Sequence, residues 1–123
     1  MPDIPLTIKD AAAAMRTGAI SSTELTGTML ERIEQLNPEL GAFIAITAGT
    51  AMNAAAKADA AFAAGTDAGP LQGIPIGVKD IIATREASTT ANSHILDRNW
   101  GAHWDAQWWS GCATRARSLW ARP

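Results

Sequence analysis

Apolar residues recur at helical spacing between residues 21 and 37. Steps of four, four and three residues place them on one face of a helix, with the charged residues mostly on the opposite face. The sequence Ser21–Glu24 predicts a capping box at the start of this helix, and Asn37-Pro38 predicts its end. The apolar stripe consists of Leu25, Met29, Ile33 and Leu36.

Two further helices are predicted, one before and one after this stretch. Thr7 and Asp10 have the spacing of a capped helix start, and Gly18 predicts the end of that first helix. Residues 51–64 are rich in alanine, which has the highest intrinsic helix propensity, and Gly65 predicts where this helix ends.

Two short apolar runs, residues 42–47 and 74–78, predict buried strands. Gly77 inside the second run indicates that another backbone or a ligand approaches closely there. Helices alternating with strands indicate the α/β class, although two strands do not make a complete sheet.

Composition narrows the range of functions. The chain has 123 residues and a formal net charge of −2, so we expect at most one small domain and no electrostatic attraction to nucleic acid or to an anionic membrane. The start, Met1-Pro2-Asp3, has no basic region of the kind a secretory signal needs. The uncharged run 40–56 is too short and too polar to span a bilayer, and we expect a cytoplasmic protein.

Cysteine and histidine give no sign of a metal or a cofactor. The single cysteine, Cys112, excludes an internal disulfide framework and fits a reducing compartment. His94 and His103 are isolated in the sequence and have no metal-ligand spacing with it. We therefore expect no cofactor.

A lysine ends the second apolar run. Lys79 has apolar chain before it and Asp80 after it. Loss of water around its ammonium group would disfavour the charged form, which is how a lysine becomes a usable base near neutral pH. A lysine followed by aspartate at a strand end is more often a solvated surface charge, so position alone leaves both interpretations open.

Residues 69–80 read G-P-L-Q-G-I-P-I-G-V-K-D. This sequence resembles the block around the catalytic lysine of the amidase signature family, which contains hydrolases and amidotransferases with a Ser–Ser–Lys triad. Residues 6–43 are similar to the family's first two helices and first strand, and T-T-A-N-S at 89–93 is similar to its T-T-A-G-S stretch. Asn92 replaces the commoner glycine, and Glu86 stands where many members have glycine.

The resemblance implies a fold and a reaction. The fold would be the N-terminal portion, helices plus first strands, of a large α/β domain with a mixed sheet, incomplete here. In the family, a neutral lysine, here Lys79, takes a proton from a bridging serine, and that serine activates a nucleophilic serine that attacks an amide carbonyl. Both serines come from Gly/Ser-rich segments well downstream. We therefore expect this chain to be inactive alone, because triad members do not act independently. The serines that lack such a context here are Ser88, Ser93 and Ser110.

The resemblance covers residues 6–106 and then stops abruptly. All five tryptophans and four of the seven arginines lie after residue 97. Deleting one C from a CCCC run in a GC-rich gene that encodes a family-like A-P-V-V-E-R-L-R-D-A-G continuation produces the observed sequence after Ala106. We therefore interpret residues 1–106 as the N-terminal part of an amidase-signature domain, and residues 107–123 as a non-homologous, out-of-frame tail.

Alternatives remain at the level of function. The first hypothesis is a truncated amidase whose full-length form acts on a small-molecule amide and self-associates; the second is a non-catalytic remnant or a small interaction module. Within the family, T-T-A-N-S and the alanine-rich helix favour a stand-alone amidase over the A subunit of glutamyl-tRNA(Gln) amidotransferase. With few strands, Ile44, Ile46, Ile74 and Ile76 would lack partners for burial, which predicts poor folding and aggregation.

Overall fold

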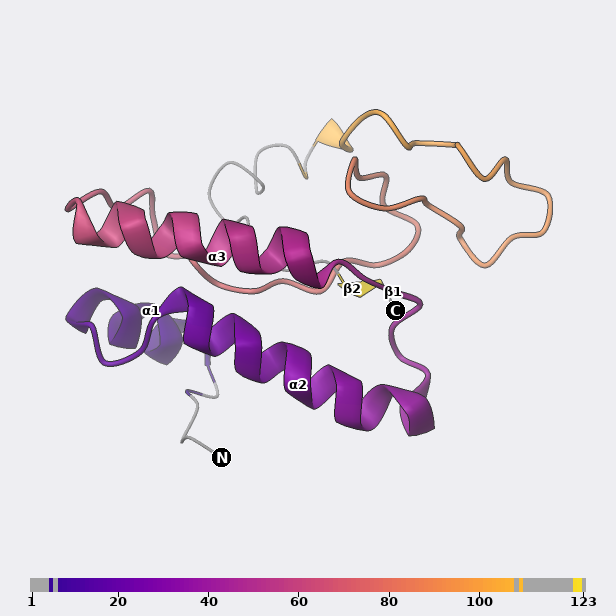
Figure 1. The fold of residues 1–123 in the computed structure, drawn as a ribbon. Coiled ribbons are helices and arrows are strands. Elements are labelled where there is room, and N and C mark those ends of the chain that lie inside the picture. The colour runs from indigo at the N-terminus through magenta and orange to yellow at the C-terminus, as the bar shows by residue number, and fades with distance from the viewer. Residues whose placement is uncertain (1–4, 6, 108, 110–120, 123) are drawn as a thin grey trace.

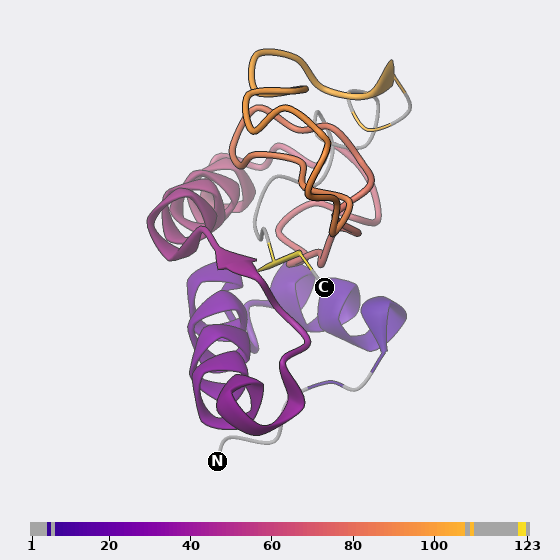
Figure 2. The same ribbon diagram turned by 90° about the vertical axis from the view of Figure 1, so that its right-hand side faces the viewer.

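A computed structural model describes residues 5, 7–107, 109, 121 and 122. These residues form three helices and two very short strands (Figure 1). Helices α2 and α3 lie side by side, and residues 80–107 form irregular loops at the end of the molecule away from α1 and α2 (Figure 2). The elements are α1 (Ile8–Thr17), α2 (Ser22–Leu40), β1 (Ala45–Ile46), α3 (Ala48–Ala63) and β2 (Ala121–Arg122).

The predicted ends of α1 are confirmed. The hydroxyl of Thr7 accepts a hydrogen bond from the backbone N–H of Asp10 at 3.1 Å and donates one to its carboxylate at 2.7 Å. Gly18 ends the helix with φ = 72°, in the left-handed region that glycine adopts without steric cost. The Asp10 carboxylate therefore accepts its hydrogen bond from the Thr7 hydroxyl. In a full capping box it would accept from the Thr7 backbone N–H.

Helix α2 begins as predicted and ends later than predicted. Its capping box is complete, with Ser21 Oγ accepting from Glu24 N at 3.0 Å and the Glu24 carboxylate accepting from Ser21 N at 2.8 Å. The predicted stop at Asn37-Pro38 is wrong, because the helix continues to Leu40.

Two interactions explain why a proline is tolerated in the last turn of α2. The Asn37 side chain bonds the backbone of Phe43 twice, donating from Nδ2 at 2.8 Å and accepting at Oδ1 at 2.7 Å. Gly41, with φ = 58°, donates its N–H to Asn37 O at 2.8 Å. These bonds fix the helix end and offset the one N–H donor that Pro38 lacks.

Helix α3 forms from the alanine-rich stretch but begins earlier than predicted, at Ala48. Thr47 gives it no side-chain capping bond. Two alanines on its inner face, Ala51 and Ala55, are fully buried, and small side chains of this kind let the backbones of two helices approach closely. Gly65 follows the helix with φ = 74°, as the sequence predicts.

The two predicted strands are the main error about the fold. In the run 42–47 only Ala45–Ile46 forms a strand, paired antiparallel with Ala121–Arg122. Ile44 and Ile46 are 56% and 43% exposed, so this run is not buried. Residues 74–78 form no strand at all, because no neighbouring strand in the described part of the chain pairs with their backbone and Pro75 lacks an N–H donor.

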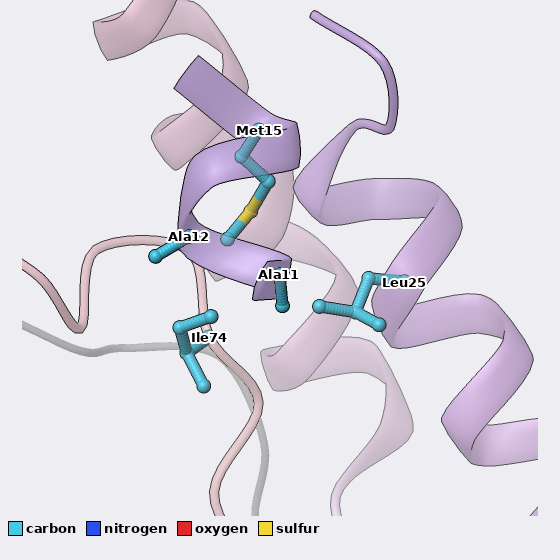
Figure 3. Close-up of a cluster of buried hydrophobic side chains, with 5 residues drawn as sticks. All are labelled: Ala11, Ala12, Met15, Leu25 and Ile74. Carbon is cyan, nitrogen blue, oxygen red and sulfur yellow. The ribbon is translucent and has the colours of Figure 1, made fainter. Parts of the chain in front are cut away.

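The core consists of helix contacts onto the 74–78 segment (Figure 3). Side chains from α1, one residue of α2 and Ile74 form a buried cluster, with Met29 and Phe62 packed at its edge. A second, smaller cluster joins Val78 to Trp109. Ile74 and Ile76 therefore find partners that the sequence did not predict, since Ile74 is buried and Ile76 packs against Val78. The first cluster consists of Ala11, Ala12, Met15, Leu25 and Ile74.

Candidate active site

A glycine fixes how the segment that carries the candidate base enters the core. Gly73 has φ = 75°, and a Cβ there would lie 3.0 Å from Met15 Sδ and 3.1 Å from Ser22 Oγ. Ser22 donates a hydrogen bond to Gly73 O at 2.7 Å and ties the segment to the start of α2. A close approach to a glycine is thus found at Gly73, whereas Gly77, where the sequence predicts one, is exposed.

Gln72 connects the same segment to the loop before it. Its side chain is buried, its amide nitrogen donates to Thr66 O at 3.0 Å, and its amide oxygen accepts from Ala68 N. Sequence reasoning assigned this residue no role. The loop is also held from α1, because Arg16 Nε pairs with Asp67 Oδ2 at 2.7 Å. Together these bonds fix residues 66–73, and hence the direction in which the chain runs towards Lys79.

Lys79 lies just beyond the buried Val78 and is itself exposed. The expectation that its ammonium group is shielded from water is wrong for this chain. The apolar residues before it turn inwards to the two clusters, and the lysine side chain remains on the outside. Lys79 O accepts a hydrogen bond from Ile82 N at 3.0 Å, which closes a turn directly after the lysine.

The neighbour of the lysine has the structural role that the sequence did not reveal. Asp80 is only 4% exposed. Its carboxylate accepts from Thr90 N at 2.9 Å and from the Thr90 hydroxyl, and its backbone oxygen accepts from Ala91 N at 3.3 Å. Asp80 thereby joins the turn at Lys79 to the T-T-A-N-S loop. The sequence marked Asp80 only as the acidic residue after the lysine, because its partner Thr90 lies ten residues further on.

The backbone of the T-T-A-N-S loop explains its asparagine. Ala91 and Asn92 have φ = 47° and 50°, in the left-handed region that glycine prefers and asparagine tolerates. Asn92 can therefore occupy the position where glycine is commoner. At the other replaced position, Glu86 Oε2 is buried and has no hydrogen-bond partner among the described residues.

Ser88 and Ser93, the described serines that follow Lys79, lie in a loop and a turn. Ser93 Oγ accepts from Ile95 N and Leu96 N, both at 3.2 Å, within its own turn. Ser88 is exposed in the loop before Thr89. Ser110 and Cys112 lie outside the described residues. What the fold joins is the turn at Lys79 and the T-T-A-N-S loop, through Asp80 and Thr90.

Neither a metal site nor a membrane span is present in the part of the chain that the structure describes. No group of three or more histidine, cysteine, aspartate or glutamate side chains could hold a metal ion there. No helix in the same residues has the length and apolar character needed to cross a bilayer.

Comparison with known proteins identifies the class. A family model described as Amidase matches residues 24–108, and the chain belongs to the amidase family. Its relatives include the A subunits of glutamyl-tRNA(Gln) amidotransferase from Bartonella henselae, 47% identical over 92 residues, and from Halorhodospira halophila, 46% identical over 91 residues. These matches cover 75% and 74% of this chain and 18% and 19% of the relatives.

Solved structures agree with the family and with the predicted fold class. The native peptide amidase from Stenotrophomonas maltophilia superposes with a TM-score of 0.82 at 31% identity, covering 98% of this chain and 25% of that one. The described helices with little strand thus match one part of the amidase-signature fold. The chain spans about a fifth of the length of its curated relatives.

Proposed function

We propose that this chain is a section of an amidase-signature enzyme that acts on carbon–nitrogen amide bonds, and that Lys79 is its general base. The observation that carries the proposal is the G-P-L-Q-G-I-P-I-G-V-K-D block at residues 69–80, inside the part matched by the family model. Lys79 would take a proton from a bridging serine, which would activate a nucleophilic serine supplied by a segment that is not among these 123 residues.

The fixed backbone around Lys79 supports this role. A base must be held in one geometry relative to the proton it accepts. Asp80 anchors the turn to Thr90, while the buried Val78 anchors the other side of the lysine. The exposed ammonium group would be covered, and would lose water, only when the serine-bearing segments pack over it.

Residues 107–123 are proposed to be out of frame with the rest. The motivating observations are the concentration of tryptophan and arginine after residue 97 and the compatibility of the tail with a one-base deletion: synonymous codons for a family-like continuation can be chosen so that the deletion yields the observed residues. Sequencing the gene tests this directly. A neighbouring reading frame without family-like sequence after codon 106 would disprove it.

Activity measurements test the proposed function. The 123-residue chain should release no ammonia from glutamine or from simple amides. The same gene, continued in the frame that the family predicts after codon 106, should give an active product. In that product Lys79→Ala should lower kcat by at least about 10²-fold, the range for loss of a general base. Lys57→Ala, on the exposed surface of α3, is the matched control and should keep full activity.

Two results would refute the proposal. One is amide turnover by the 123-residue chain that is abolished by Lys79→Ala, because the chain would then need no downstream serines. The other is an active restored product in which Lys79→Ala has no effect, because the base would then be a different residue.

Two kinds of amidase-signature enzyme are compared: a stand-alone amidase and an amidotransferase subunit. The T-T-A-N-S loop and the alanine-rich helix favour a stand-alone enzyme, whereas identities of 46–47% with the amidotransferase subunits favour that type of subunit. The peptide amidase is 31% identical. We propose the amidotransferase type on this difference. A restored product that uses glutamine as its amide donor in preference to peptide amides would support it, and the opposite preference would reject it.

A further inference from the structure

An apolar groove of about 380 Å³ runs along α2. Its walls are α1, the stripe of α2, residues 42–43 and residues 74–77. All four residues of the predicted stripe line it, so the helical period in the sequence correctly placed them on one face. Lys79 is not among the lining residues, and the groove is therefore a feature separate from the candidate base.

Burial along the stripe falls steadily from one end to the other. Leu25 is 2% exposed, Leu36 is 41% exposed, and Leu40 in the next turn is 66% exposed. A leucine left in water forgoes about 1.5–3 kcal/mol that burial would supply. The sequence pattern thus specifies a helix buried along its whole length, but the described residues cover only its first turns.

Apolar side chains next to the groove are also exposed, as expected if a further layer of protein covers this side of α2. Ile44 and Ile46, which continue from the wall of the groove at residue 43, are also largely exposed. Exposed apolar side chains therefore continue from the groove side of α2 onto the strand that follows it, and a separate set, which includes Ile81 and Ile95, lies in the loops of residues 80–107.

We propose that this groove is the surface on which the remaining part of an amidase-family domain packs, and that the chain binds this part even when it is a separate polypeptide. The chain superposes on about a quarter of the peptide amidase with a TM-score of 0.82. In the family the other three quarters or more of the sequence lie outside the matched segment. That remainder is long enough to cover an apolar groove and the exposed strand beside it.

The lining defines the chemistry of the occupant. The side chains are almost all aliphatic, and the amide of Asn37 is already bonded to Phe43. Among the described lining residues Arg32 is the one charged side chain, and it is exposed. The occupant must therefore present a largely apolar face, because the described lining offers few polar partners to a buried polar group.

This inference takes its partner from the proposed function, but its test does not depend on activity. The 123-residue chain is mixed with the amidotransferase subunit of Bartonella henselae lacking its own matched segment, and binding is followed by size-exclusion chromatography and titration. We expect a one-to-one complex. Leu36→Asp should weaken it at least tenfold, whereas Gln35→Asp, on the same helix but outside the groove, should leave it unchanged. Lys79→Ala should also bind normally.

Three results would overturn the inference. They are the absence of a complex, a complex that Leu36→Asp does not weaken, and a dimer of this chain that Leu36→Asp dissociates, since the occupant would then be a second copy. A complex that forms as expected but hydrolyses no amide would instead count against the proposed function alone.

A second measurement covers the case in which the trimmed relative does not stay soluble. Residues 1–106 replace the matched segment of the full-length relative, with a cysteine introduced at position 36 or 35, and labelling of each site by a thiol reagent is quantified by peptide mapping. Leu36→Cys should react in the 123-residue chain and be protected at least tenfold in the fusion, whereas Gln35→Cys should react in both. Equal labelling of Leu36→Cys in the two proteins would disprove the proposal.

Discussion

At the scale of single residues, two positions fix the segment that carries Lys79. Gly73 gives a backbone conformation and a close contact that a side chain would disturb, and Asp80 buries a carboxylate that binds the T-T-A-N-S loop. The glycine was visible in the sequence, but its close contact with Met15 and Ser22 was not, because close approach depends on which element packs against the segment. Burial of Asp80 was equally hidden, since its partner lies ten residues away.

Gly73→Ala should destabilise the chain more than glycine conformation alone explains. A left-handed backbone costs an alanine about 1–2 kcal/mol, and overpacking against Met15 and Ser22 adds about 1–3 kcal/mol. Gly65→Ala is the matched control, because its φ is 74° but nothing lies within 4 Å of the added Cβ. Urea unfolding measures both variants. Equal losses in the two would show that the contact at Gly73 contributes nothing.

Thr90→Val should test the link between the lysine turn and the loop. It removes the hydroxyl that donates to the buried Asp80 carboxylate, at a cost of about 1–3 kcal/mol in the free energy of unfolding. Thr66→Val, at an exposed threonine, should change stability by less than about 0.5 kcal/mol. Urea denaturation of the two variants gives the comparison, and similar small losses would argue against an anchoring role for Asp80.

At the scale of elements, helices were predictable and strands were not. The capped starts of α1 and α2 follow from residues three apart, so local sequence determines them. The end of α2 depends on Asn37 reaching Phe43, a tertiary contact that outweighs the proline. A strand depends even more on distant partners, and residues 74–78 have no paired neighbour among the described residues.

The contact between α1 and the loop that follows α3 predicts a dependence on pH. The hydrogen bond from Arg16 lowers the pKa of Asp67 below its usual value, and a bond from Gly69 N adds to the effect. The folded pKa lies below the unfolded one, so this stabilisation is complete above about pH 5 and is lost as pH falls through the unfolded and then the folded pKa.

Asp67→Asn should therefore flatten the loss of stability between about pH 5 and pH 2. Arg16→Gln removes the other half of the pair and should flatten it in the same way. The urea midpoint measured across this pH range provides the test. If the urea midpoint falls as steeply with decreasing pH in both variants as in the unaltered chain, the Arg16–Asp67 pair does not cause the pH dependence.

At the scale of the whole molecule, helix contacts form a core but do not cover it. The described part of the chain buries one cluster under α1 and another around Val78, and leaves the groove along α2 open. The sequence predicted too few strands for a complete sheet, and Ile44 and Ile46 are exposed as expected. It could not reveal that Ile74 is buried against α1 and α2, or that Ile76 packs in the cluster around Val78.

The 123-residue chain should consequently unfold with low cooperativity. Calorimetry is expected to show a broad transition whose van't Hoff enthalpy is smaller than the calorimetric one, together with aggregation that grows with concentration. A sharp two-state transition at low concentration, with equal enthalpies, would contradict this expectation. It would also weaken the case for a missing layer over the groove.

The sequence by itself determined the helices, their caps, the apolar stripe of α2 and the family, because each depends on residues close together in the chain or on a contiguous motif. Only the tertiary structure decided that Gly73 packs closely against Met15 and Ser22, that Asp80 anchors the T-T-A-N-S loop, that Lys79 is exposed, and that residues 74–78 form no strand. These outcomes depend on which distant segments are present to pack or to bond. The helices that local patterns predict therefore form in this chain. Burial and strand pairing occur only where a distant segment of the chain is present to make the contact.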